Sequence, residues 1–198
     1  MKLILASQSR SRRALLSAAG VPHEALAPGV DEESMKAGLR AEGANARSLA
    51  DALAELKSLK LSRRHASDLV LGCDQTLELE DGATLDKSSS REEARVQLQQ
   101  LRGKTHTLIS AAVISEAGAP VWRHIDTAKL RMRDFSDVFL DSYLDTEWPI
   151  IQGCVGNYRM EALGAQLFTR IDGSHFTILG LPMLALLDYL RTRGVLMA

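Results

Sequence analysis

The chain has 198 residues, with 24 lysines and arginines, 25 aspartates and glutamates, and 45% hydrophobic but only 5% aromatic residues. This composition is that of a soluble globular protein and excludes an intrinsically disordered chain. A formal net charge of −1 excludes a broad surface that coats nucleic acid or an anionic membrane, since both need an excess of Lys and Arg. We expect a single domain over residues 1–198, because this length buries a core without disulfides or metals.

The pattern of apolar residues and cysteines indicates a cytoplasmic protein with no membrane partner. No apolar run approaches the roughly 20 residues of a spanning helix, and the N-terminus lacks the long apolar region of a signal peptide. Cys73 and Cys154 are too few for a disulfide framework and lack zinc-ligand spacing. The histidines include no pair four residues apart, so we expect no histidine-built zinc site.

The first third of the chain predicts a strand, a helix, a loop and a second helix. The apolar run at 2–6 predicts a strand, and a helix follows the polar turn at 7–13 and stops at Gly20. Residues 21–35, with two prolines and four acids, predict a loop with room for a short strand. Leucines at helical spacing predict a helix over 45–62.

The middle of the chain predicts a buried strand and a capped helix. Residues 69–73 are typical of a buried strand, continued by residues 77–79, which places Asp74 partway along the strand or just beyond it. A capping box at 90–93 predicts a helix to about Leu101 that stops at Gly103.

The remaining third predicts strands and helices in alternation. In order, these are strands at 105–115 and 121–132, a helix from Ser136 through Leu144, a hairpin of 166–171 with 176–179, and a helix from Pro182 to Gly194.

Three sets of residues suit the binding of phosphate. The turn at 7–13 places serine hydroxyls, free backbone N–H groups and three arginines at a helix N-terminus, which favours anions; alternatively, the serines cap the helix and the arginines face water. Asp74, at the end of a buried strand, is placed to hold a metal or accept a proton, or else to cap the next turn. Lys57 and Lys87 would bind phosphate only if the fold brings them together, because a single lysine is more commonly a solvated surface residue.

Two other motifs carry no function. Gly103-Lys104-Thr105 resembles the end of a phosphate-binding P-loop but follows a helix instead of preceding one, and Leu98 replaces the first glycine. Ser174-His175 lacks the G-x-S-x-G context of a serine hydrolase.

Several short motifs follow one another along the chain. They are Ala6-Ser7-Gln8-Ser9 with Arg12, Val30-Asp31-Glu32, Leu53-Ala54 with Lys57, Gly72-x-Asp74, Lys87, Gly156-x-Tyr158 and Gly180-Leu181-Pro182. Together, from residue 3 to about residue 190, they resemble the signature of the Maf family of nucleoside triphosphate pyrophosphatases. The combination is far more specific than any single motif, and the chain is identified as a member on this basis.

The resemblance implies both a fold and an activity. The fold is α/β, with a long twisted mixed sheet, flanking helices and two lobes around a cleft, similar to inosine triphosphatases. The activity is a hydrolase reaction on a phosphoric anhydride, converting a nucleoside triphosphate to the monophosphate and diphosphate with a divalent metal, Mg²⁺ or Mn²⁺. The resemblance further implies a homodimer, removal of non-standard nucleotides, and a link to arrest of cell division.

The resemblance also assigns roles to residues. Asp74 matches the proton-accepting aspartate, Ser7, Ser9 and Arg12 match the phosphate-binding turn, and Glu32, Lys57 and Lys87 match other polar residues of the cleft. Substrate preference divides the family at positions that match Ser11, Gln75 and Glu161. An Asp-Gln pair and a later Glu are typical of the branch acting on 7-methyl-GTP, while an Asp-Thr pair and a later Gln are typical of the branch acting on dTTP and UTP. A carboxylate suits guanine, because it accepts hydrogen bonds from the ring N–H and the amino group.

The chain departs from the family pattern at four positions. Arg10 and Ser88 replace prolines, Ser11 replaces a bulky or basic residue, and Ala162 replaces a glycine. Two hypotheses therefore compete. One is an enzyme in which water attacks the α-phosphorus, cations offset the developing charge, and Asp74 orients the metal-activated water and accepts its proton. The other is a nucleotide-binding regulator that has lost turnover.

The near-neutral net charge conceals a local separation of charge. Residues 1–23 contain four basic residues and no acid, and residues 24–35 contain four acids and no basic residue. Such a cationic turn beside an acidic segment suits a compact, highly charged nucleotide and its metal.

Overall fold

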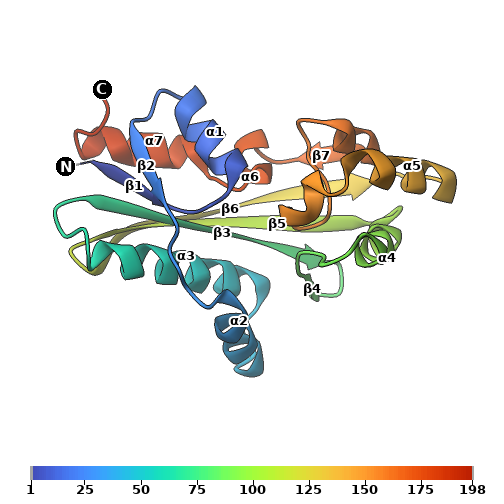
Figure 1. Ribbon diagram of the computed structural model, residues 1–198, viewed down its shortest axis with the longest axis horizontal. Helices are drawn as coiled ribbons and strands as arrows, with labels where there is room; N and C mark the ends of the chain where they lie inside the picture. Colours follow the sequence, from blue (N-terminus) through green and yellow to red (C-terminus); the bar gives the residue numbers. More distant parts are fainter. Residues whose placement is uncertain (1, 198) are drawn as a thin grey trace.

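A mixed β-sheet runs the length of the molecule in the computed structural model, which describes residues 2–197 (Figure 1). Strand order is β2-β1-β3-β5-β6-β7, with β4 paired to β3; β1 is parallel to β2 and β3, and the other pairs are antiparallel. The strands are β1 (Leu3–Ala6), β2 (His23–Leu26), β3 (Leu69–Leu79), β4 (Thr84–Leu85), β5 (Thr105–Glu116), β6 (Ala119–Met132) and β7 (Phe168–Asp172). This sheet confirms the α/β fold that the resemblance implies.

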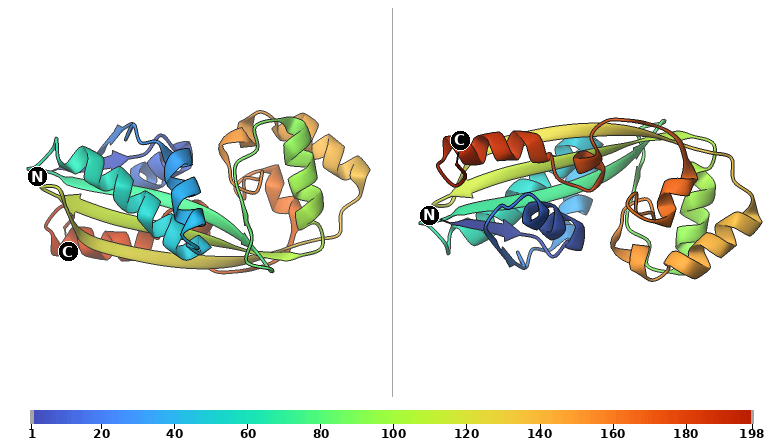
Figure 2. Two further views of the ribbon diagram at one scale, coloured as in Figure 1. Left: turned by 90° about the horizontal axis from the view of Figure 1, so that it is seen from below. Right: turned by 90° about the horizontal axis from the view of Figure 1, so that it is seen from above.

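The helices gather around the two ends of the sheet and form two lobes (Figure 2). The first lobe contains α1 (Arg10–Ala18), α2 (Glu32–Ala41), α3 (Ala46–Ser62) and α7 (Met183–Thr192). The second contains α4 (Arg91–Leu101), α5 (Asp137–Glu147) and the 3-10 helices η1 (Ile150–Gly153) and η2 (Leu163–Leu167), and the short α6 (His175–Ile178) lies between the lobes. None of the helices described in residues 2–197 is both long and apolar enough to cross a membrane.

Each lobe has its own hydrophobic cluster, and the long strands contribute to both. Leu5, Leu16 and Leu71 belong to the cluster of the first lobe, and Leu98 and Tyr143 belong to that of the second. Because β3, β5 and β6 pass through both lobes, the sheet forms the floor of the space between them (Figure 2).

Helix α3 lies close to the sheet because small residues line their contact. Ala46, Ala50 and Ala54 pack against apolar residues of β5. A Cβ atom added to Gly72 of β3 would lie 2.1 Å from the carbonyl oxygen of Ala54, so only glycine fits there. This close contact brings side chains of α3 directly beside those that follow Gly72 on β3.

Most of the predicted elements are confirmed, and their ends follow the expected chemistry. Ser9, Asn45, Ser90 and Ser136 each accept a hydrogen bond from a backbone N–H as N-caps of α1, α3, α4 and α5. Strand β3 is longer than its first apolar run and continues without a break through Asp74, so this residue lies within the strand.

Two predictions for the connecting segments are wrong. Residues 32–35, where the end of a loop was expected, form the first turn of helix α2. The predicted hairpin of 166–171 with 176–179 does not form: β7 pairs with β6, and residues 175–178 are helical. A run of four residues with three apolar side chains does not distinguish strand from helix, and here the hydroxyl of Ser174 caps a helix. Gly173, at φ 143°, lies against Ala128, where the chain crosses β6.

Candidate active site

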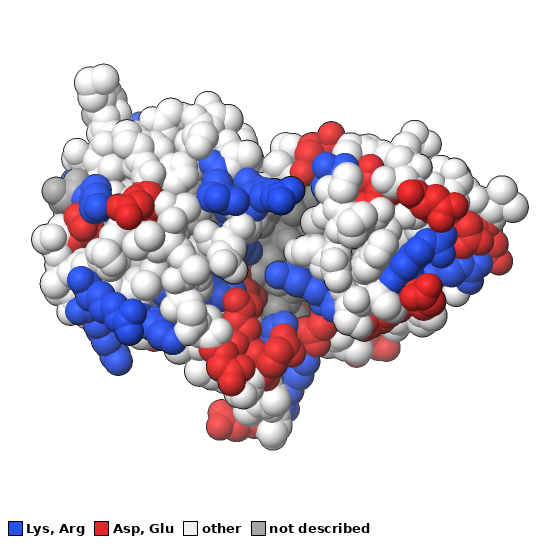
Figure 3. Space-filling model, viewed as in Figure 1, with Lys and Arg blue, Asp and Glu red and all other residues white. Residues whose placement is uncertain are grey.

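A cleft of about 1150 Å³ lies between the two lobes and contains the whole predicted site. All ten residues proposed from the sequence line it: Ser7, Ser9, Ser11, Arg12, Glu32, Lys57, Asp74, Gln75, Lys87 and Glu161. Lys and Arg side chains border the hollow from both sides, and Asp and Glu side chains gather below it (Figure 3). This arrangement suits a ligand that carries several negative charges together with a cation.

The turn after β1 presents a helix N-terminus to the cleft. Ser9 is the N-cap of α1, and its Oγ accepts a hydrogen bond from the backbone N–H of Arg12 at 3.4 Å. The backbone N–H of Ser9 donates to the Oγ of the buried Ser7 at 3.2 Å. Arg10 and Arg13 are exposed, so both interpretations of this turn hold in part: the serines cap the helix, and its positive end still faces the cleft.

Arg12, by contrast, folds back onto the protein. Its Nε donates to the carbonyl oxygen of Gly180 at 2.8 Å, and its Nη1 donates to that of Cys73 at 2.9 Å. Gly180 has φ 92°, and a Cβ atom there would lie 3.2 Å from the Arg12 Nε. Within residues 2–197 no hydrogen bond engages the Nη2 of Arg12, so a positioned guanidinium group retains one NH₂ for a ligand.

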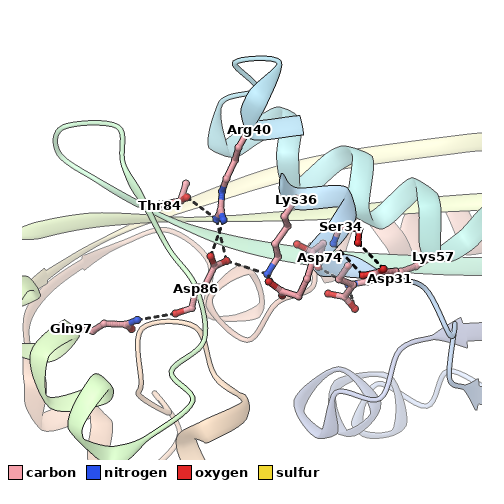
Figure 4. Close-up of polar contacts among 11 residues, drawn as sticks. Asp31, Ser34, Lys36, Arg40, Lys57, Asp74, Thr84, Asp86 and Gln97 are labelled. Atoms are coloured by element: carbon pink, nitrogen blue, oxygen red, sulfur yellow. Dashed lines mark hydrogen bonds and ion pairs between the residues drawn. The ribbon is translucent and has the colours of Figure 1, made fainter. Parts of the chain in front are cut away.

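Lys57 lies at the centre of the acidic half of the cleft. Its Nζ lies 2.6 Å from Oδ1 of Asp74 and 3.1 Å from Oε1 of Glu32, and Figure 4 shows Lys57 beside Asp74. The side chains of Lys57 and Asp74 are only 6% and 10% exposed. One ammonium group therefore faces two carboxylates, which leaves this buried cluster with a net negative charge.

Lys87 reaches the cleft from the loop between β4 and α4. It is exposed to the solvent of the cleft, and no described residue provides it with an ion-pair partner. Partial dehydration between the lobes, together with the positive charge of Arg12, lowers the pKa of Lys87 from its usual value. An anion that binds between Lys87 and Arg12 would relieve the repulsion between these two cations.

Glu32 and Asp74 fit a divalent cation that binds together with phosphate. Mg²⁺ prefers hard oxygen ligands and is commonly held by one or two carboxylates plus substrate phosphates. No group of three or more His, Cys, Asp or Glu residues that could hold an ion occurs in residues 2–197. Glu32 and Asp74, which share the Lys57 ammonium group, are the carboxylates that would hold such a cation.

The residues expected to select the base lie in different surroundings. Ser11, in the first turn of α1, and the exposed Glu161, just before η2, both border open parts of the cleft. The amide nitrogen of Gln75 lies 2.9 Å from the carbonyl oxygen of Thr177 and 3.1 Å from that of Ile178. Gln75 therefore joins β3 to α6, and its amide nitrogen donates to these backbone carbonyls and to the Ser110 hydroxyl at 2.9 Å.

Tyr158 forms part of the wall of the second lobe, and the preceding glycine permits its position. A Cβ atom on Gly156 would lie 2.6 Å from the Tyr158 ring, so this motif requires glycine. The Tyr158 hydroxyl lies 2.8 Å from Nε2 of His106, which is 1% exposed. Burial lowers the pKa of His106 to about 4, so the ring is neutral at pH 7.

Four charged residues that the sequence patterns did not reveal also line the cleft: Lys36, Arg40, Asp86 and Arg159. Lys36 and Arg40 on α2 both contact Asp86, which directly precedes Lys87. A signal for α2 was present, because Asp31 precedes acids in a first turn and Arg40 falls in the last turn. Once the helix is recognised, Lys36 and Arg40 are four residues apart and share one face.

The fold and the cleft together define a class of protein. It is a two-lobed α/β protein whose cleft combines a cationic helix N-terminus with a buried Lys–carboxylate cluster. A sequence model of the family described as "Maf-like protein" matches residues 2–193. The chain belongs to the Maf family.

Curated relatives match over nearly their whole length and carry one name. The "Nucleoside triphosphate pyrophosphatase" of Caulobacter vibrioides is 50% identical over 192 residues, 97% of this chain and 96% of the relative. That of Ruegeria pomeroyi is 50% identical over 194 residues, 98% and 97% of the two chains. A solved structure described as a nucleoside-triphosphatase, or dITP/XTP pyrophosphatase, from Mycobacterium abscessus has a TM-score of 0.50 at 15% identity and covers 98% of both chains. This likeness shows that the fold is shared.

Proposed function

We propose that this protein hydrolyses a nucleoside 5′-triphosphate to the monophosphate and diphosphate. The observation that supports this most directly is the convergence of the Lys57 cluster, Arg12 and Lys87 on one cleft. Each is held by a different element, and together they match the two needs of the reaction: a proton acceptor and cations around the phosphates. The names of the relatives agree with this reaction.

The cations of the cleft bind the phosphates and offset the charge of the transition state. Backbone N–H groups at the start of α1 and the guanidinium of Arg12 face the cleft on one side, and Lys87 on another. Negative charge grows on the bridging oxygen as diphosphate leaves, so donors held rigidly around the phosphates act mainly on the transition state. Arg12 meets this need because two backbone carbonyls hold its guanidinium in place.

Asp74 is the group that accepts the proton of the attacking water. Lys57 binds Oδ1 of Asp74 and so fixes the orientation of the carboxylate, while no described residue donates a hydrogen bond to Oδ2. In our proposal Oδ2 contacts the water that attacks the α-phosphorus. A divalent cation held by Glu32, Asp74 and the phosphates would supply neutralising charge and make that water more acidic.

Base selection, as we propose it, depends on Glu161 and Ser11. Glu161 is exposed in the cleft and accepts hydrogen bonds, which suits the N–H and amino groups of a guanine such as 7-methyl-GTP. Gln75 contributes indirectly, since its amide is bonded to the α6 backbone. Glu161→Gln should therefore shift preference away from guanine bases, whereas Gln75→Thr should lower turnover of all bases alike.

The decisive experiment measures diphosphate release by the purified protein from 7-methyl-GTP, UTP and dTTP, with Mg²⁺, with Mn²⁺ and with EDTA. We expect metal-dependent release from at least one triphosphate. Asp74→Asn should lower kcat by about 10²–10⁴-fold, the usual contribution of a general base, while the Asn side chain keeps an oxygen for Lys57 to bind.

A matched control separates this loss from a general effect of removing a carboxylate. Asp81→Asn changes an exposed turn residue just after the same strand, and its kcat should equal that of the wild type. Near-normal turnover in Asp74→Asn would disprove the role of Asp74. Tight nucleotide binding without any diphosphate release would instead support the regulator hypothesis.

A further inference from the structure

Three charged residues form a bridge between α2 and the loop that carries Lys87. Lys36 Nζ lies 3.0 Å from Oδ1 of Asp86, and Arg40 donates from Nη1 to Oδ2 at 2.9 Å and from Nη2 to Oδ1 at 3.1 Å. Figure 4 shows both cations converging on the one carboxylate. We call Lys36, Arg40 and Asp86 the interlobe clasp.

Helix α2 depends on polar contacts for its position. None of its residues is fully buried, so apolar packing constrains it weakly. Its first residue, Glu32, binds Lys57, and further along the helix Lys36 and Arg40 bind Asp86, with Arg40 also bonded to the Thr84 hydroxyl. The side chain of Lys36 is 15% exposed, so its ion pair is better shielded from solvent than an ordinary surface pair.

The other side of the clasp is anchored in the second lobe. The backbone carbonyl of Asp86 accepts a hydrogen bond from the amide of Gln97 on α4 at 3.1 Å. The Gln97 side-chain oxygen accepts from Nδ2 of the fully buried Asn157 at 2.8 Å. A continuous set of hydrogen bonds and ion pairs thus leads from α2, through Asp86, to the interior of the opposite lobe.

We infer that Asp86 is a positioning residue that sets the separation of Glu32 and Lys87 across the cleft. Glu32 begins the helix that the clasp holds, and Lys87 directly follows the residue that holds it. This inference rests on the proposed function. If Asp86 served only to neutralise Lys36 and Arg40, its removal would free two cations at the cleft and strengthen binding of a triphosphate, which is the opposite result.

The first test replaces Asp86 with Asn, which keeps the side-chain size and removes the charge. We expect kcat for diphosphate release to fall by about tenfold, as misplaced groups lose transition-state contacts, with little change in KM. Asp86→Glu retains a carboxylate for both cations and should recover most of the lost kcat. A higher kcat/KM in Asp86→Asn than in the wild type would overturn the inference.

The second test asks whether Asp86 acts through Lys87. Lys87→Met should lower kcat/KM by itself, and Asp86→Asn added to it should lower kcat/KM by clearly less than the roughly tenfold loss expected in the wild-type background, since coupled residues are not additive. Independent, additive losses would show that Asp86 does not position Lys87.

A third measurement does not require turnover. Amide hydrogen exchange of residues 32–41 and 84–90 should be faster in Asp86→Asn than in the wild type, because the helix and the loop hold each other. Asp141→Asn is the matched control: it breaks an Arg95 pair of similar exposure, 45% against 41% for Asp86, outside the cleft. Unchanged exchange in Asp86→Asn would refute the clasp, whereas absent diphosphate release by the wild type would refute only the proposed function.

Discussion

Replacing Lys57 with Met tests the buried cluster most severely. The methionine fills a similar volume but leaves Asp74 and Glu32 without their shared cation. Removing one partner of a buried ion pair typically lowers the free energy of unfolding by about 3–5 kcal/mol, because the remaining charge is uncompensated. Here the cost falls mainly on Asp74, whose side chain is 10% exposed, because that of Glu32 is 36% exposed and solvent screens it.

For a chain of this length, each kcal/mol shifts the melting temperature by about 2–4 °C, so the variant should melt about 6–20 °C below the wild type. Thermal unfolding followed by circular dichroism at pH 7 in EDTA measures this difference. Added Mg²⁺ should raise the melting temperature of Lys57→Met more than that of the wild type, because the ion binds the two carboxylates of the folded state.

Lys60→Met serves as the control, since Lys60 lies one turn further along α3 and is exposed, with its Nζ bonded to the Gly29 carbonyl. Its melting temperature should stay close to that of the wild type, as expected for a surface substitution. Equal melting temperatures for Lys57→Met and Lys60→Met would refute the account of Lys57 as the partner that stabilises two carboxylates.

Three further predictions follow from individual residues. Gly180→Ala should lower kcat/KM for diphosphate release by about tenfold and stability by about 1–2 kcal/mol, because φ is 92° and the new methyl group meets Arg12; unchanged kinetics would contradict the role of Arg12. The pKa of His106 is lowered to about 4 in the folded state from 6.5, so the stability it contributes above pH 6.5 is lost as the pH falls towards 4, by about 3 kcal/mol. Urea unfolding of His106→Gln should show a smaller loss between pH 7 and pH 4, and an equal loss would refute this. The mass of the predicted homodimer, measured by sedimentation, should be twice the 21.6 kDa of one chain. A measured mass equal to that of one chain would refute the prediction.

The sequence predicts which residues come together in the cleft better than it predicts the connections around it. Local patterns mark the serine turn, the strand carrying Asp74 and the helix carrying Lys57, because caps and apolar periodicity act over a few residues. The place of Gly72 in a motif is visible in the sequence, but the reason for the glycine is tertiary. A Cβ atom at this position would lie 2.1 Å from the carbonyl oxygen of Ala54.

The residues that the sequence did not reveal depend on contacts between distant segments. Lys36 and Asp86 are separated by 50 positions, and Arg40 and Asp86 by 46. Nothing near Asp86 distinguishes it from an ordinary loop acid. Gln75 is a similar case: its position beside Asp74 favours contact with substrate, but the carbonyls that occupy its amide come from residues more than 100 positions away.

The continuous strands have a mechanical consequence for the cleft. Strand β3 has 11 residues and β6 has 14, and both pass from one lobe into the other (Figure 2). Continuous strands, and not a flexible linker, therefore join the lobes at the base of the cleft. Any motion that opens or closes the cleft must bend the hydrogen-bonded sheet. The same continuity couples the two hydrophobic clusters, so we expect the lobes to unfold together in one cooperative transition.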